Sequence, residues 1–153
     1  MYYIIYECPI GSLTLGEKNG KLTYLLFGER KPEGYEEKPT PFLIDVSRQL
    51  TEYFAGQRKG FSVPVCPEGT AYRKSVWNLL ADIPYGETVT YGELARRSGN
   101  PKASRAVGGA NHHNPISIII PCHRVVGANG KLVGYGGGLD IKSFLLRLEQ
   151  DYK

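Results

Sequence analysis

Cys122 and His123 form the pair of neighbouring side chains that could carry out nucleophilic chemistry in this sequence. A thiolate is a strong nucleophile, and a nearby imidazole or cation lowers the pKa of a thiol. Pro121, directly before the cysteine, restrains the backbone there. Adjacent side chains on an extended chain point to opposite sides, so adjacency does not establish that thiol and imidazole meet. From these residues alone, a catalytic cysteine and a structural one both stay open.

The other two cysteines, Cys8 and Cys66, have no metal-binding spacing. Both are typical of small buried hydrophobic residues, and a disulfide between them stays open. His112 and His113 are adjacent, but only one further histidine exists and no acidic residue lies near them. We therefore expect no metal site.

The net charge of +4 is unevenly distributed. Residues 1–66 carry equal numbers of acidic and basic side chains, so the whole excess lies in residues 67–153. Residues 96–124 carry five basic side chains and no acidic one: Arg96, Arg97, Lys102, Arg105 and Arg124. Such a stretch can contact the phosphate backbone of a nucleic acid, and a solvated basic face explains the charge equally well.

The length and composition indicate an ordinary globular protein. The chain has 153 residues, of which 41% are hydrophobic and 22% charged, enough for one compact domain or two small lobes. No apolar run reaches the roughly 18 residues of a membrane span. The first residues lack a basic start and a cleavage site for a signal peptide, so we expect a cytosolic protein.

The elements that must position the candidate cysteine fall into two lobes, residues 1–66 and 67–153. The first lobe is predicted to contain strands over residues 2–6, 13–16, 22–27 and 61–65, and a helix over residues 42–54. Asn19-Gly20 predicts a hairpin turn between the second and third strands. Residues 28–41 are rich in proline and glycine and predict a loop, and residues 64–69 predict a linker.

In the second lobe, the spacing predicts a helix over residues 70–81 with Tyr72, Val76, Leu79 and Leu80 on one face. Two shorter helices, over residues 91–97 and 101–110, form a helix-turn-helix. Asn100 suits the N-cap of the second helix and Pro101 suits its first position. The small residues of this helix suit a close approach, either to DNA or to the protein's own backbone.

Residues 116–120 predict a buried strand or extended run that leads to the cysteine. Residues 125–126 and 131–133 flank another Asn-Gly turn and predict a hairpin, placed where a wing follows a helix-turn-helix. A glycine-rich loop over residues 134–138 precedes a last helix over residues 139–150. The inward face of that helix is predicted to hold Ile141, Phe144, Leu145 and Leu148.

Residues 105–110 (RAVGGA), Asn114-Pro115 and residues 120–126 (IPCHRVV) together strongly resemble the O6-alkylguanine-DNA alkyltransferase family. The resemblance is strong over residues 70–150 and loose over residues 1–66. It implies an α+β fold, with a ribonuclease-H-like α/β lobe followed by a winged helix-turn-helix lobe. This arrangement agrees with the elements predicted from the residues.

The resemblance also implies a role for each residue of a catalytic set. Cys122 matches the alkyl acceptor, His123 the base that activates it through a water, and Glu149 the carboxylate that orients the histidine. Asn114 matches a hinge between the helix-turn-helix and the active-site loop. Tyr91 matches a tyrosine that helps to rotate the nucleotide out of the duplex and assists the departing guanine.

Further residues are expected at the DNA and around the flipped base. Arg105 matches the arginine that fills the gap left in the base stack. The remaining expected DNA contacts are Tyr91, Tyr135, Ala103, Ser104, Asn111 and Arg124. The pocket is expected to comprise Val125, Tyr135, Gly136, Gly137 and Lys142, with the backbone at Cys122 and Val125 bonding the base edge. The small Gly136 and Gly137 would leave room for bulky groups such as benzyl.

The implied activity is the irreversible transfer of an alkyl group from O6-alkylguanine in double-stranded DNA to Cys122, in one turnover and without a cofactor or metal. Whether O4-alkylthymine is also a substrate stays open. We expect a monomer that binds no membrane. Two rivals are a non-catalytic alkyltransferase-like protein, which the presence of Cys122 argues against, and a Cys-His hydrolase with multiple turnovers.

Overall fold

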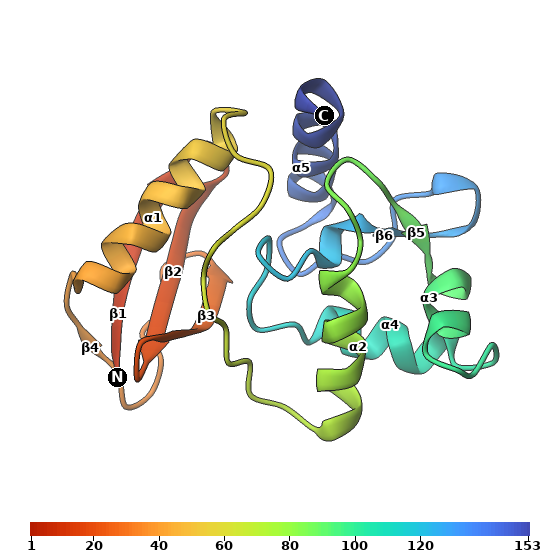
Figure 1. The fold of residues 1–153 in the computed structure, drawn as a ribbon, viewed down its shortest axis with the longest axis horizontal. Helices are drawn as coiled ribbons and strands as arrows, with labels where there is room; N and C mark the ends of the chain where they lie inside the picture. The colour runs from red at the N-terminus through yellow and green to blue at the C-terminus, as the bar shows by residue number, and fades with distance from the viewer. The chain divides into compact units, whose positions relative to one another are not determined.

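The computed structural model describes residues 1–153 and divides into two compact units, Met1–Glu68 and Gly69–Lys153. Figure 1 shows a sheet with one helix in the first unit, and helices joined by loops and short strands in the second. Buried apolar side chains occur in both units, so each has a core of its own. None of the helices is both long and apolar enough to cross a membrane.

The first unit is built on a four-stranded sheet in the order β3-β2-β1-β4. The strands are β1 (Tyr2–Cys8), β2 (Gly11–Lys18), β3 (Lys21–Phe27) and β4 (Glu36–Glu37). The first three form an antiparallel meander, and the predicted turn lies between β2 and β3, where Asn19 and Gly20 have φ of 53° and 73°. The three long strands confirm the prediction. Strand β4 lies within residues 28–41, where we predicted a loop. The prediction missed it because two glutamates give no strand signal.

Helix α1 (Pro41–Phe54) covers one face of this sheet (Figure 1). Thr40 caps its N-terminus by accepting the N–H of Leu43, and proline occupies the start of the helix, where its missing N–H costs nothing. Leu43, Val46 and Leu50 are buried, as their spacing predicts. The helix ends before Gly56, whose φ is 75°.

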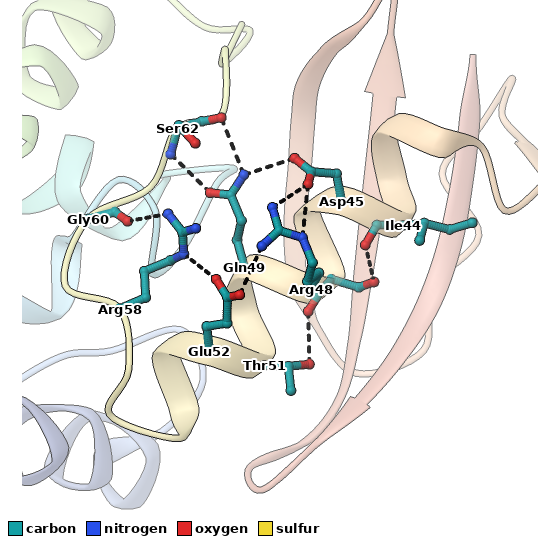
Figure 2. Close-up of polar contacts among 10 residues, drawn as sticks. Ile44, Asp45, Arg48, Gln49, Thr51, Glu52, Arg58, Gly60 and Ser62 are labelled. Carbon is teal, nitrogen blue, oxygen red and sulfur yellow. Dashed lines mark hydrogen bonds and ion pairs between the residues drawn. The ribbon is translucent and has the colours of Figure 1, made fainter.

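Residues 61–65 do not form the predicted strand. A single residue pair, Leu22 and Val65, makes a β-bridge there. The side chain of Gln49 in α1 instead forms two hydrogen bonds with the backbone of Ser62. It accepts the N–H at 3.0 Å and donates to the carbonyl at 3.4 Å (Figure 2). A side chain therefore satisfies the groups that a neighbouring strand would need.

The second unit consists of short elements joined by tight turns. Its helices are α2 (Ala71–Ala81), α3 (Tyr91–Arg97), α4 (Ser104–His112) and α5 (Leu139–Tyr152), with 3-10 turns η1 (Cys122–Arg124) and η2 (Ala128–Gly130) and strands β5 (Val89–Thr90) and β6 (Val125–Val126). In α2 the buried side chains are Val76, Trp77 and Leu80, whereas Tyr72 is exposed. Trp77 donates to the carbonyl of Ala110 at 2.8 Å and so ties α2 to α4.

The predicted helix-turn-helix comprises α3 and α4, but α4 begins at Ser104 rather than at Pro101. Asn100 does not cap the helix. Its side chain accepts the N–H of Lys102 at 3.0 Å, which closes a local turn. The chain therefore makes one extra turn before the helix starts, and α4 has no side-chain cap.

The predicted hairpin over residues 125–133 is also wrong. Strand β6 pairs in parallel with β5, with Val125 opposite Val89. Residues 127–131 form a turn closed by the N–H of Gly127 and the carbonyl of Lys131 at 2.7 Å. The Asn-Gly signal therefore marks the 3-10 turn η2, but β6 pairs with β5 and not with a strand that follows this turn.

Candidate active site

Asn114 closes the loop that leads to Cys122. Its Nδ2 donates to the carbonyl of Ile120 at 2.8 Å, and its Oδ1 accepts the N–H of Ile116 at 3.0 Å. The amide is buried and satisfies one acceptor and one donor of the same loop. Asn114, the residue expected to be a hinge, thus lies at the base of the loop that carries the cysteine.

The predicted strand over residues 116–120 is a compact turn instead. Ile119 donates its N–H to the carbonyl of Ser117 at 2.8 Å, around Ile118 with φ of 71°. A three-residue turn of this kind is rare, and a β-branched residue with positive φ is strained by about 1–3 kcal/mol. Ile118 is buried, so packing holds the strained turn. Apolar periodicity cannot distinguish such a turn from a strand.

A second tight turn surrounds Pro121. The N–H of Cys122 donates to the carbonyl of Ile120 at 2.8 Å, and Pro121 has φ of −80° and ψ of 65°. This is an inverse γ-turn, which suits the fixed φ of proline. Cys122 then begins η1, so Cys122 and His123 do not lie on an extended chain.

The thiol of Cys122 lies just below the surface, in a residue that is 4% exposed. Burial raises the pKa of this thiol above its ordinary value. Hydrogen bonds with Asn114, Ser117 and Tyr135 and the charge of Lys142 oppose the rise without cancelling it. At neutral pH the side chain is therefore a protonated thiol, and nucleophilic attack requires a base.

His123 is completely buried and bonded to Glu149. Its Nε2 lies 2.7 Å from Oε2 of the carboxylate. Burial alone would raise the pKa of Glu149, but hydrogen bonds and charges from His123 and Arg124 outweigh it and hold that pKa well below the usual range. The carboxylate is therefore ionised and can only accept hydrogen bonds.

These contacts fix the tautomer of His123. Burial lowers the pKa of the imidazole, and the bond to Glu149 only partly opposes this effect, so the ring is neutral at pH 7. Because Glu149 is an acceptor, the single ring proton lies on Nε2. Nδ1 thus carries a free lone pair, and this buried atom has no hydrogen-bond partner in the protein. Its environment suits a general base.

Arg124 does not contact DNA from this position, which corrects its assignment. The side chain is buried and makes a forked pair with Glu149, from Nε at 2.8 Å and Nη2 at 3.1 Å. Nη1 donates to the carbonyl of Ile83 at 2.6 Å. Gly86 adds its N–H to the same carboxylate at 3.3 Å. Arg124 therefore neutralises Glu149, and its charge adds to the burial that lowers the pKa of His123.

The inward face of α5 differs from the predicted one. Phe144 is 39% exposed, whereas Lys142 and Glu149 are buried beside Leu145 and Leu148. Lys142 and Glu149, which both have buried hydrogen-bond partners, thus occupy this face in place of the predicted Phe144.

Lys142 links two segments near the cysteine. Its Nζ donates to the carbonyls of Val125 at 2.6 Å and Val133 at 3.0 Å and lies 6.0 Å from the ring centre of Tyr135. Burial lowers its pKa, and the nearby Cys122 opposes that change.

Tyr91 lies within the cluster around the thiol. Its hydroxyl donates weakly to the carbonyl of Val133 at 3.4 Å and bonds with Asn111. Burial raises its pKa, and its interaction with Cys122 adds to that rise. Gly108 of α4 lies beside its ring, where a Cβ would meet two ring carbons at 3.7 Å. At this glycine, the close approach is therefore to the protein itself.

Profiles of protein families match both units. One described as "6-O-methylguanine DNA methyltransferase, ribonuclease-like domain" matches residues 1–67, and one described as "6-O-methylguanine DNA methyltransferase, DNA binding domain" matches residues 71–151. The chain belongs to the O6-methylguanine DNA methyltransferase family. The predicted family and fold class, a ribonuclease-like lobe followed by a DNA-binding lobe, are confirmed.

Similar proteins span nearly the full chain. The sequence is 58% identical to a methylated-DNA–protein-cysteine methyltransferase of Methanosarcina acetivorans, over 97% of this chain and 98% of the relative. It is 43% identical to the constitutive enzyme of that name from Bacillus subtilis, over 97% and 95%. Its structure resembles that of Mycobacterium tuberculosis OGT in complex with DNA, with a TM-score of 0.93, 46% identity and coverage of 99% and 94%.

In this member of the methyltransferase family, α4 presents one exposed arginine near its start. Ser104 and Arg105 are exposed at its start and Ala103 is half-buried, as a DNA contact requires. Arg96 and Arg97 of α3 are also exposed, but both pair with Glu93. Arg105 makes no ion pair and is the basic side chain on α4 that is free to contact phosphate or bases.

Two features of the site have weak or absent sequence signals. Ser117 bonds with the thiol of Cys122, but an isolated serine in an apolar run does not indicate this role. Asn111, expected on the DNA surface, is buried instead, and its Nδ2 lies 3.4 Å from the carbonyl of Cys122.

Gly136 in the expected pocket loop is exposed and has open space around its Cα, and Gly137 is half-buried.

Proposed function

We propose that this protein repairs duplex DNA by transferring the alkyl group of O6-alkylguanine irreversibly to Sγ of Cys122. The observation that carries the proposal is the combination of a buried, protonated thiol with a neighbouring neutral histidine whose Nδ1 is free. Such a thiol is inert until a base takes its proton, and His123 would be that base.

The reaction would proceed by in-line displacement. The proton of Cys122 passes to Nδ1 of His123, through a bridging water as the family resemblance implies. Sulfur attacks the alkyl carbon, the bond from that carbon to O6 breaks, and guanine leaves as its anion. Tyr91, which interacts with Cys122, would donate a proton to this anion and so assist its departure as neutral guanine. Glu149 acts as a positioning residue, because it holds the proton on Nε2 and stabilises the imidazolium that forms.

DNA contacts would make the substrate accessible. An O6 atom within the duplex cannot reach a thiol below the protein surface, so the nucleotide must leave the stack at an expense of a few kcal/mol. Arg105 at the start of α4 would fill the gap, and contacts of α4 with the backbone would supply the compensating free energy.

The product ends the reaction. A thioether is a poor leaving group, so each chain would act once. We further propose that the protein works as a monomer in the cytosol. The proposed displacement would use only side chains of this protein, without a metal or a cofactor. The same thiol would also take the alkyl group of O4-alkylthymine.

Intact-protein mass spectrometry with a duplex that contains O6-methylguanine tests the proposal. We expect one methyl group per chain, located on Cys122, and none on Cys122→Ala. Methylation of another residue would contradict the proposal. Continued release of product beyond one equivalent would favour a Cys-His hydrolase, and binding of the lesion without transfer would favour a non-catalytic recognition protein.

A further inference from the structure

Ser117 is the one polar side chain in residues 115–121, where every neighbour is isoleucine or proline. It is 8% exposed, so water has almost no access to its hydroxyl. A buried hydroxyl is unfavourable unless it has a hydrogen-bond partner. The structure provides that partner in the side chain of Cys122. The proposed mechanism gives Ser117 no role, so this contact has a purpose still to be assigned.

The backbone of the loop holds Ser117 in place. Its carbonyl accepts the N–H of Ile119 at 2.8 Å, which requires the strained, positive φ of Ile118. Strained residues concentrate where function needs a fixed geometry. The side chain of Asn114 closes the same loop through two further hydrogen bonds. The hydroxyl is therefore held next to the sulfur of Cys122 by a loop with little freedom to rearrange.

A hydroxyl can bond with both protonation states of the sulfur. It accepts a hydrogen bond from the thiol and, after rotation, donates one to the thiolate. Asn114, Tyr135 and the charge of Lys142 also favour the thiolate. However, the amide of Asn114 is also tied to the loop backbone, and Tyr135 and Lys142 belong to other segments. Ser117 is thus the hydroxyl within the cysteine's own loop.

We infer that Ser117 is a further catalytic residue, whose hydroxyl donates a hydrogen bond to Sγ of Cys122 as the thiolate forms. This inference rests on the proposed function. The proton of the thiol still passes to Nδ1 of His123. The hydroxyl keeps its own proton, and no covalent bond of Ser117 forms or breaks. The hydrogen bond lowers the pKa of the Cys122 thiol and so opposes the effect of burial.

The gain in rate is smaller than the gain in thiolate. One hydrogen bond to a charged group raises the thiolate fraction about 10- to 100-fold. A less basic sulfur is also a weaker nucleophile, which cancels about half of this gain on a logarithmic scale. We therefore expect Ser117→Ala to slow single-turnover transfer from O6-methylguanine in a duplex about 3- to 10-fold at neutral pH.

Alkylation by iodoacetamide isolates the contact, because this reagent needs neither DNA nor a flipped base. Peptide mass spectrometry gives the rate for each cysteine between about pH 7 and pH 11. We expect the midpoint of the pH–rate profile of Cys122 to lie higher in Ser117→Ala than in wild type. The exposed Cys66 is an internal control whose midpoint should not move. Ser143→Ala, the same change at an exposed position of α5, is the control variant.

The direction of the shift separates a lost hydrogen bond from a damaged loop. A loosened loop would expose the thiol, and because burial raises the pKa of Cys122, the midpoint would then fall. Ser117→Thr and Ser117→Val form a second pair of similar shape, in which only threonine has a hydroxyl. This pair keeps the test valid if Ser117→Ala fails to fold. Threonine should keep the wild-type midpoint, and valine should raise it.

The remaining outcomes separate the inference from the function. A midpoint that is unchanged or lower in Ser117→Ala and Ser117→Val would overturn the inference. A raised midpoint with an unchanged rate of transfer from DNA would also overturn the catalytic role of Ser117. If wild type transfers no alkyl group but the midpoints shift as expected, the proposed function is wrong and the hydrogen bond between Ser117 and Cys122 stands.

Discussion

Nε2 of His123 lies 2.7 Å from Oε2 of Glu149, and both side chains are almost completely buried. The bond fixes the imidazole proton on one nitrogen and leaves the other without a partner in the protein. Burial lowers the pKa of His123, and the charge of Arg124 on the same carboxylate adds to this effect, so the imidazole stays neutral although it touches an anion. The chemistry proposed for Cys122 would therefore depend on three buried groups rather than on its neighbour alone.

Replacing the base should slow transfer and spare DNA binding. We expect His123→Ala, and the bulkier His123→Gln, to lower the single-turnover rate about 100- to 10,000-fold. The imidazole is fully buried, so it contributes no surface for DNA. Fluorescence anisotropy with an undamaged duplex measures affinity in parallel. Loss of affinity in step with the rate would argue against the relay.

Removing Glu149 should destabilise the second unit. Glu149→Ala leaves the buried Arg124 without its counter-ion, which we expect to lower the free energy of unfolding by about 3–5 kcal/mol in urea titrations. Glu149→Gln should be milder, because an acceptor remains. Glu93→Ala, which breaks exposed pairs with Arg96 and Arg97, should change stability by no more than about 1 kcal/mol. Similar losses for the buried and exposed positions would contradict this account.

Acidification should destabilise the protein in two steps of the same sign. The pKa of His123 is lowered in the fold, so unfolded chains take up a proton first as the pH falls below about 6.5. The pKa of Glu149 is also lowered, so its contribution is complete above about pH 4.3 and is lost below it. Melting temperatures from pH 8 to pH 3 test this, and His123→Gln should flatten the upper step. A melting temperature that rises on acidification would refute it.

Arg105 should matter for duplex DNA and little for a free base. We expect Arg105→Ala to slow repair of O6-methylguanine in a duplex while its reaction with free O6-benzylguanine stays near wild type, because the free base needs no flipping. Arg147→Ala makes the same charge change at an exposed position of α5 and serves as control. Equal losses with both substrates would remove Arg105 from the flipping step.

Lys142→Met should loosen the segment that follows the cysteine. The carbonyls of Val125 and Val133 lose a shared charged donor, so amide hydrogen exchange over residues 126–138 should accelerate. Transfer should also slow, because the pKa of the Cys122 thiol loses the lowering effect of the ammonium group. Lys131→Met, an exposed change in the same segment, is the control. Unchanged exchange would show that Lys142 does not hold this loop.

The sequence predicted the elements with strong local signals. Asn19-Gly20 and the apolar spacing of α1 correctly predict the first unit's hairpin and helix. The family motif around Cys122 predicts the fold of both units. In these cases the local preference and the tertiary structure agree, so short-range patterns suffice.

The errors lie where distant partners decide the structure. From the sequence, Arg124 is expected to be a surface charge. In the structure it is buried, because it pairs with Glu149, which lies far along the chain. The isoleucine run before Cys122 has the composition of a strand. In the structure it is a turn with Ile118 at positive φ, and the side chain of Asn114 bonds the backbone of this turn. Strand pairing of β6 with β5 likewise cannot be read from either segment alone. Most of these departures lie at the candidate active site, where strained or buried polar groups are common.

Glu149 lies in helix α5, 26 residues after His123 in the chain. The helix is bonded to the turn at Gly86, whose N–H donates to Glu149 and whose carbonyl accepts a hydrogen bond from Nε2 of Gln150 at 2.7 Å. The thiol and the imidazole therefore come earlier in the chain than the carboxylate that holds the imidazole. Under the proposed mechanism, a chain in which α5 has not docked would have a nucleophile but no aligned base, so folding of α5 would be the step that makes the thiol reactive.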